Sequence, residues 1–178
     1  MSNGLVDLHT HSTASDGTLT PTELMRAAAA VGLEAIALTD HDTCNGMAEA
    51  QAEADRLGVR LIPGIEISAQ FPGPGVLHIL GHFVDPNAPA LGNISKILLA
   101  GRNERNPQIV RRLNELGCKV TMEQVEAIAR AGVKPGEPYT VGRPHIAQAL
   151  VENGAVASIK QAFDVYLGTT GAAYFDKE

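Results

Sequence analysis

The chain has 178 residues and a formal net charge of −6; hydrophobic residues make up 44% of it, aromatic residues only 4%, and Trp is absent. This length allows one domain, or one domain with an insertion, and the core must be built from aliphatic side chains. No block of Lys and Arg occurs, which argues against a broad surface for long nucleic acid, whereas a small phosphorylated substrate held by a few arginines fits the composition.

The sequence also predicts no membrane association. It contains neither a signal peptide nor an apolar run long enough to span a bilayer, which indicates a cytoplasmic protein. The two cysteines, Cys44 and Cys118, are far apart and have no metal or redox spacing. We therefore expect two free thiols.

The first 91 residues alternate between short apolar strands and helices. We predict strands at 5–8, 35–38, 59–68 (interrupted at Pro63-Gly64) and 76–81, with helices at 21–31 and 46–57. The first helix carries a full start signal, with Thr20 as N-cap, Pro21 at the first helical position and Glu23 two positions later. Apolar strands joined by helices and short links predict a parallel sheet, whose chemistry collects at the carboxyl ends of the strands.

The pattern changes after about residue 90. Helices are predicted at 94–116, 122–131, 144–153 and 158–167, with a turn-rich link at 132–138. Thr121 has the character of an N-cap for the second of them. We interpret this part as a helical subdomain inserted in, or appended to, the α/β part.

Two histidines, His9 and His11, stand two residues apart where the first strand ends. Residues i and i+2 of a strand point to the same face, so both imidazoles can reach one metal ion. Asp7 lies on that face and is expected to orient a ring N–H. The alternative interpretation is two polar residues at a strand end.

Polar side chains suited to metal binding recur at the ends of the successive strands. They are His9, His11, Asp16, Asp40, His41, Glu66 and His78. Five of the six histidines fall between residues 9 and 82, and none of these lies in the two intervening helices, which a random scatter would not produce. Imidazoles mixed with carboxylates suit Mn, Fe(II) or Zn. Because the six of them other than Asp40 already exceed the ligands of one tetrahedral ion, we expect two or more ions and metal-dependent hydrolysis, particularly of phosphate esters, through a metal-bound hydroxide.

These motifs resemble those of the polymerase-and-histidinol-phosphatase (PHP) family of metal-dependent phosphoesterases. The matching stretches are Asp7-Leu8-His9-Thr10-His11-Ser12, Ser15-Asp16-Gly17, Leu38-Thr39-Asp40-His41-Asp42-Thr43, Pro63-Gly64-Ile65-Glu66-Ile67-Ser68 and His78-Ile79-Leu80-Gly81. The helical part resembles members similar to a nucleoside 3′,5′-bisphosphate phosphatase. There the matches are Gly101-Arg102-Asn103-Glu104-Arg105, Gly142-Arg143-Pro144-His145 and Val165-Tyr166-Leu167-Gly168.

The resemblance implies a fold, a metal centre and a phosphate site. The fold would be part of a distorted (β/α)7 barrel with a helical insertion subdomain, and the cofactors two to three divalent ions (Mn, Fe or Zn). It implies that one ion lies among His9, His11 and Glu66, that Glu66 also serves an ion bound by His78, and that Asp16 and His41 serve another. Asp40 would support the ligands rather than bind metal.

The resemblance also implies that four residues of the helical part bind substrate phosphate, namely Arg102, Arg105, Arg143 and His145. Arginine suits phosphate because its guanidinium offers two parallel donors. The alternatives are a solvated helix face for Arg102 and Arg105, and a capping or surface role for Arg143 and His145. His82 and Cys44 match no ligand position; we expect His82 to be structural or exposed, and Cys44 to be an inert thiol.

The chain departs from the family at its C-terminal end. The family's later motifs, an Ala-His-Pro-like strand end and a final Asp-x-His, have no counterpart here, and a (β/α) barrel typically needs about 250 residues. We therefore expect residues 1–91 to form the N-terminal half of the barrel with the metal motifs, and residues 92–178 the helical insertion subdomain. An open barrel edge would favour self-association.

Two classes of function follow. The first is a metal-dependent phosphoesterase that hydrolyses a phosphomonoester of a small nucleotide, such as a nucleoside 3′,5′-bisphosphate. The second is a truncated, inactive metal-binding or regulatory module. Among enzymes, a histidinol phosphatase and a short-oligonucleotide nuclease are the alternatives.

Overall fold

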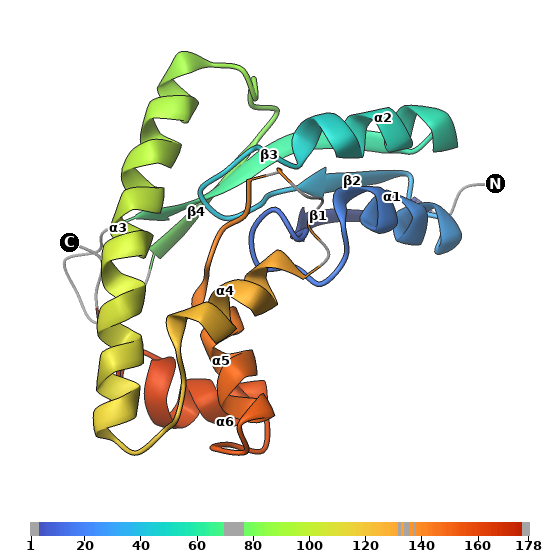
Figure 1. Ribbon diagram of the computed structural model, residues 1–178. Helices are drawn as coiled ribbons and strands as arrows, with labels where there is room; N and C mark the ends of the chain where they lie inside the picture. Colours follow the sequence, from blue (N-terminus) through green and yellow to red (C-terminus); the bar gives the residue numbers. More distant parts are fainter. Residues whose placement is uncertain (1–3, 70–76, 132, 134–135, 137, 176–178) are drawn as a thin grey trace.

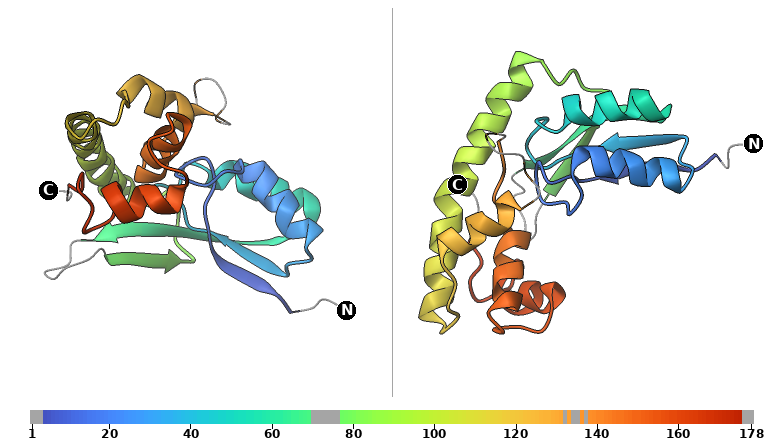
Figure 2. Two further views of the ribbon diagram at one scale, coloured as in Figure 1. Left: turned by 90° about the horizontal axis from the view of Figure 1, so that it is seen from below. Right: turned by 45° about the vertical axis from the view of Figure 1, so that its right-hand side comes forward.

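A curled four-stranded sheet and a unit of helices make up the computed structural model, which describes residues 4–69, 77–131, 133, 136 and 138–175 (Figure 1). The strands are β1 (Val6–Thr10), β2 (Ala35–Leu38), β3 (Arg60–Ala69) and β4 (Leu77–His82), in the order β1-β2-β3-β4. The further views in Figure 2 show the sheet as one layer with the helical unit beside it. This arrangement confirms the predicted α/β class and a partial barrel.

The predicted parallel sheet is correct for three strands and wrong for the fourth. β1, β2 and β3 are parallel, whereas β4 runs antiparallel to β3. The physical reason is the short connection, residues 70–76, because a parallel crossover needs roughly a dozen residues or more. The antiparallel pairing sets Ser68 opposite His78 and Glu66 opposite Leu80.

Two helices, α1 (Pro21–Ala30) and α2 (Met47–Leu57), cover one face of the sheet. Their buried side chains, such as Met25 and Met47, pack with Ile36 and Leu38 of β2. All four residues of β2 are buried, as expected for a central strand that is covered on both faces.

The predicted start of α1 is confirmed. Thr20 Oγ1 accepts a hydrogen bond from the Glu23 N–H (3.2 Å), and the Thr20 N–H donates to Glu23 Oε2 (2.9 Å), so two unsatisfied N–H groups of the helix start find partners. Gly32, just beyond the C-cap Val31, has φ +76°, a left-handed conformation that glycine adopts without strain.

β3 is continuous through Pro63 and Gly64, where we expected an interruption. Pro63 pairs with Leu38, and Gly64 pairs with His82. A Cβ atom on Gly64 would lie 2.7 Å from Thr39 Cγ2 and 2.9 Å from the Gly81 carbonyl oxygen. Because residue 64 is a glycine, β3 can approach Thr39 and Gly81 closely at this point, and the strand continues without an interruption.

The helical unit has a hydrophobic core of its own. It comprises α3 (Pro89–Glu115), α4 (Met122–Arg130), α5 (Arg143–Glu152), α6 (Ile159–Ala162) and a π-helical turn, η1 (Phe163–Leu167). The core includes Ile109, Leu113, Val125, Ile146 and Leu150, all essentially inaccessible to solvent. α3 begins five residues before its predicted start at 94, and the predicted link at 132–138 lies largely outside the described residues. The exact boundary at residues 91 and 92 stays a prediction.

The N-cap of α4 is also as predicted. The Gln124 N–H donates to Thr121 Oγ1 at 3.2 Å.

Among the described residues, no helix combines the length and the apolar composition that crossing a membrane requires.

The two outer strands each have one edge without a partner strand in the described part of the chain. On β1, Val6 and Leu8 are about half exposed, at 52% and 44%. Exposed apolar side chains on an unpaired strand are a typical site of association between chains. Self-association through this edge stays a prediction.

One buried ion pair joins the sheet to the helical unit. Arg102 of α3 donates to Asp42 Oδ2 from Nε (2.8 Å) and from NH2 (2.5 Å), and Asp42 is fully inaccessible to solvent. Asp42 has φ +59° and also accepts hydrogen bonds from Ser68, through its N–H (2.7 Å) and its Oγ (3.0 Å). The loop after β2, the end of β3 and α3 therefore meet at one carboxylate.

Removing one partner of this buried pair should destabilise the protein strongly. Arg102→Met should lower the free energy of unfolding by about 3–5 kcal/mol, because it removes the guanidinium charge from the buried Asp42 carboxylate. Lys160→Met is the matched control, since Lys160 pairs with Asp164 while 83% of its side chain is exposed, and it should have no measurable effect. Urea denaturation measures both, and equal stabilities of the two variants would contradict this role of the pair.

Candidate metal centre

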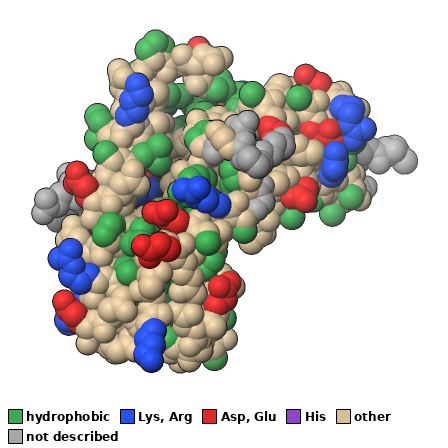
Figure 3. All heavy atoms as spheres, viewed as in Figure 1, with side chains coloured by type: hydrophobic (Ala, Val, Ile, Leu, Met, Phe, Trp, Pro, Cys, Tyr) green, Lys and Arg blue, Asp and Glu red, His purple; other side chains and the backbone are tan. Residues whose placement is uncertain are grey.

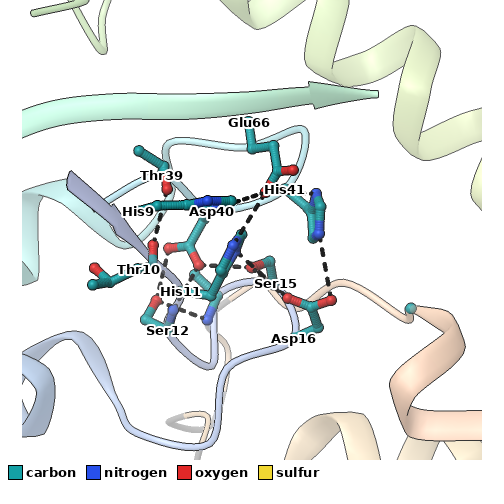
Figure 4. A network of polar contacts seen from close by, with 12 residues as sticks. His9, Thr10, His11, Ser12, Ser15, Asp16, Thr39, Asp40, His41 and Glu66 are labelled. Atoms are coloured by element: carbon teal, nitrogen blue, oxygen red, sulfur yellow. Dashed lines mark hydrogen bonds and ion pairs between the residues drawn. The ribbon is translucent and has the colours of Figure 1, made fainter. Parts of the chain in front are cut away.

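Four histidines surround one carboxylate, that of Glu66, which is only 4% exposed. Figure 4 shows three of them, His9, His11 and His41, beside Glu66. Glu66 Oε2 lies 2.9 Å from His9 Nε2, 3.1 Å from His11 Nε2 and 3.5 Å from His41 Nδ1. The other oxygen, Oε1, lies 2.7 Å from His78 Nδ1. The structure therefore brings to one point ligand-type residues from β1, β3 and β4 and from the loop after β2.

Backbone hydrogen bonds fix these positions. The Asp42 N–H donates to the Glu66 carbonyl (2.9 Å) and the Glu66 N–H donates to the Asp40 carbonyl (3.1 Å), which sets His41 directly beside Glu66. His78 lies two residues from the partner of Glu66 on β4, so it projects from the same face of the sheet as that partner. The reversed direction of β4 thus still delivers His78 to the site.

Asp16 belongs to the same cluster but comes from the loop after β1. Its Oδ1 lies 3.6 Å from His11 Nδ1 and its Oδ2 lies 3.6 Å from His41 Nε2. A Cβ atom on the next residue, Gly17, would lie 2.2 Å from the His11 carbonyl oxygen, so glycine is required for the loop to fold back this closely.

Asp40 holds this loop and does not itself face the cluster. Its carboxylate accepts hydrogen bonds from the Ser12 N–H, the Ser12 hydroxyl and the Ser15 hydroxyl, each at 2.7 Å. Burial raises the pKa of Asp40, although these three donors oppose the shift. The supporting role that we expected for Asp40 agrees with this geometry; the two serines that complete it were not predicted.

Asp7 differs from expectation. Its Oδ1 accepts a hydrogen bond from the backbone N–H of His9 at 3.2 Å, so it shapes the strand end instead of orienting an imidazole ring.

The six predicted ligands fit divalent metal ions. Three groups of three have candidate ligand atoms within 4.8 Å of one another: His9, His11 and Glu66; His11, Asp16 and His41; and His41, Glu66 and His78. His11 Nδ1 and His41 Nδ1 are buried and have no hydrogen-bond partner within the described part of the chain, which is costly unless something else binds them. Shared members between the groups favour more than one ion.

The charge states also suit metal binding. Burial lowers the pKa of His41 to about 4, so its ring is neutral near pH 7 and offers a lone pair. Burial alone would raise the pKa of Glu66, but the hydrogen bond with His9 and the neighbouring histidines lower it, so this carboxylate is ionised. Burial raises the pKa of the Cys44 thiol to about 11, so Cys44 stays protonated, as expected for an inert thiol.

The four predicted substrate-binding residues come from two helices. Arg102 and Arg105 lie in α3, and Arg143 and His145 lie in α5. Arg102 is engaged by Asp42 and Ser68, as described above. Arg105 is 4% exposed, donates from NH2 to Asn106 Oδ1 (3.2 Å) and has a buried Nε without a hydrogen-bond partner. Burial lowers the pKa of Arg105 to about 10, helped by the nearby charges of Arg143 and Arg102, so an anion between these side chains would be stabilised.

Arg143 and His145 lie in the first turn of α5, which approaches Asp16. A Cβ atom on the N-cap, Gly142, would lie 3.7 Å from Asp16 Cβ and 3.8 Å from Arg102 NH1. His145 Nδ1 accepts a hydrogen bond from the Gly142 N–H at 2.9 Å, so the proton of the neutral ring is on Nε2. Burial lowers the pKa of His145, which keeps that ring neutral.

One residue near the arginines was missed by sequence reasoning. Tyr174 lies with its ring 5.7 Å from the Arg143 guanidinium carbon and acts electrostatically on Arg105. Its position 31 residues beyond Arg143 carries no spacing signal.

Charged side chains of both signs are scattered over the described part of the face in Figure 3, which gives no broad basic surface there.

A family model described as the PHP domain matches residues 7–175. The chain belongs to the PHP domain family. This confirms the resemblance seen in the motifs.

Two relatives of this PHP chain are named for different activities. A 5′-3′ exoribonuclease of Haemophilus influenzae is 40% identical over 97% of this chain and 60% of its own length. A 3′,5′-nucleoside bisphosphate phosphatase of Chromobacterium violaceum is 39% identical over 91% of this chain and 54% of its own length. This chain thus spans little more than half the length of these relatives.

A crystal structure shares the fold. A protein from Bifidobacterium adolescentis, assigned as a metal-dependent phosphoesterase, superposes with a TM-score of 0.85 and 33% identity, over 97% of this chain and 58% of its own. The predicted PHP-type fold is therefore confirmed.

Glu66→Gln should lower the metal content of this PHP chain more than His78→Ala does. Glu66 belongs to two of the three ligand groups and offers both oxygens, whereas His78 belongs to one. Elemental analysis after dialysis against Mn²⁺ measures the difference, with circular dichroism to verify that both variants fold. Equal losses would argue against a shared carboxylate.

Proposed function

We propose that this PHP chain carries the metal-binding half of a phosphoesterase site that hydrolyses a terminal phosphate ester of a small nucleotide. The observation that carries the proposal is the juxtaposition of the six candidate ligands with the first turn of α5, where Gly142 adjoins both Asp16 and Arg102. An ester phosphate bound between them would touch metal on one side and cationic donors on the other.

The ligands proposed are His9, His11, Asp16, His41, Glu66 and His78, for two to three ions of Mn, Fe or Zn. When bound, such ions polarise a phosphate oxygen and lower the pKa of a coordinated water. Asp40 fixes the loop that carries Asp16, through Ser12 and Ser15.

The phosphate-binding group proposed is Arg105, Arg143 and His145, with Arg102 at its edge. The orphaned Nε of Arg105 is a donor that a phosphate oxygen would satisfy. His145 Nε2 carries a proton and can donate to a phosphate oxygen without adding charge. The N-terminus of α5 adds the positive end of its helix dipole, which favours an anion.

The relatives support a nucleotide as the substrate. One is named for a nucleoside bisphosphate and the other for RNA, so a phosphorylated nucleotide end is common to both. The net charge of −6 favours a small substrate over long nucleic acid. A short RNA degraded from its 5′ end is the second candidate, and it is favoured by the relatives that are named as 5′-3′ exoribonucleases.

Release of inorganic phosphate from adenosine 3′,5′-bisphosphate with added Mn²⁺ tests the proposal. We expect release that EDTA abolishes and that exceeds release of mononucleotides from a short RNA. Preferential release of mononucleotides would favour the exoribonuclease, and absence of both activities would contradict the proposed function for this chain.

Arg143→Ala should weaken phosphate binding without unfolding the chain. A charge-assisted contact of this kind contributes about 1.5–3 kcal/mol, so KM, or the Kd for inorganic phosphate, should rise roughly tenfold or more. Arg130→Ala is the matched control, because Arg130 is largely exposed and stacks on Tyr139 in the helical unit. Unchanged affinity with Arg143→Ala would return Arg143 to a capping role.

A further inference from the structure

The first metal-binding strand contains a β-bulge at its first candidate ligand. β1 pairs with β2 through Asp7 opposite Ile36 and then Thr10 opposite Leu38. Two residues of β1, Leu8 and His9, therefore stand against the single residue Ala37. A bulge of this kind bends the strand and redirects its side chains, and bulges are common beside active sites.

Side chains from two directions hold this bulge. On one side, Asp7 Oδ1 accepts a hydrogen bond from the His9 N–H at 3.2 Å. On the other side, His82 Nε2 lies 2.7 Å from the Leu8 carbonyl oxygen. A carbonyl oxygen can only accept, so the His82 ring carries its proton on Nε2 and donates.

His82 reaches β1 from the opposite end of the sheet. It is the last residue of β4, whereas β1 is the outer strand at the other end of the order β1-β2-β3-β4. Along β4, His78 and His82 lie four residues apart and therefore on the same face. One of these histidines enters the cluster around Glu66, and the other ties the two outer strands of the curled sheet together.

The ligand nearest to this contact has the least support from packing. The side chain of His9 is 49% exposed, against 21% for His11 and 14% for His41. Its direction therefore depends mainly on the backbone from which it projects. Within the described residues, none of the three ligand groups includes His82.

We propose that His82 is a positioning residue for the metal centre: its hydrogen bond to the Leu8 carbonyl holds the β1 bulge, and thereby directs His9 toward Glu66. His82 does not bind metal itself. The inference rests on the proposed metal centre, and it concerns the ion among His9, His11 and Glu66 rather than the one among His11, Asp16 and His41.

Mn²⁺ titration of metal-depleted protein by calorimetry tests this role with two variants. His82→Ala should weaken the binding of one ion by roughly 10–100-fold, the usual range for loss of a supporting contact, and leave the other binding events unchanged. His82→Gln should restore most of that affinity, because its amide can donate to the same carbonyl. Thr121→Ala, which removes the N-cap of α4, is the control for a loss of stability elsewhere and should leave all Mn²⁺ affinities unchanged.

Each other outcome overturns the inference. Wild-type affinities in His82→Ala would show that the contact does not position His9. Complete loss of one ion in both variants would make His82 a ligand, and uniform weakening of every ion would make its role structural. Failure of the wild-type chain to bind Mn²⁺ would instead overturn the proposed metal centre.

A second measurement needs no variant and is independent of folding defects. The ¹⁵N chemical shifts of the imidazole nitrogens in the metal-free protein should show His82 as the Nε2–H tautomer. The Nδ1–H tautomer would overturn the inference, because Nε2 could then not donate to the Leu8 carbonyl.

Discussion

The contact of one buried carboxylate with four imidazoles is the interaction on which the rest of this structure depends. Glu66 is 4% exposed, and each of its oxygens faces at least one histidine nitrogen at 2.7–3.1 Å. Without metal, such a cluster concentrates polar groups, two of them orphaned, in a place where burial is costly. Three local features bring these side chains together despite that cost, namely a bulge in β1, the glycine at position 17 and the left-handed backbone conformation of Asp42.

A second buried contact links this centre to the helices. Asp42 lies one residue after His41, and it receives Arg102 from α3 and Ser68 from β3. The same guanidinium adjoins Gly142 at the start of α5. The position of the proposed phosphate-binding group relative to the metal ligands is therefore set by a charge pair inside the protein, which argues that Arg102 contributes more by holding this geometry than by contacting substrate.

The sequence predicted the parts of the fold and site that depend on local pattern. The spacing of His9 and His11 and the Thr20 cap are encoded within a few residues, and the structure contains both as expected. The candidate ligands also come together, although Glu66 lies inside β3 and His78 lies at the start of β4. The direction of β4 was missed because apolar strands have the same pattern in either direction; the signal was the short link at 70–76. The contacts of Asp7, Arg102 and His82 were missed. The contact of Asp7 depends on the backbone geometry at His9. The partners of Arg102 and His82 lie 60 and 74 residues away in the sequence, beyond the reach of any spacing rule.

We propose that the Glu66 carboxylate is shared between two metal ions. Electron paramagnetic resonance of the chain loaded with Mn²⁺ tests it most directly, because ions joined by a carboxylate are magnetically coupled. We expect a coupled spectrum for the wild-type chain with two or more equivalents of Mn²⁺. In Glu66→Gln we expect the six-line signal of isolated ions instead of the coupled spectrum. Isolated-ion signals in the fully loaded wild-type chain would contradict the claim.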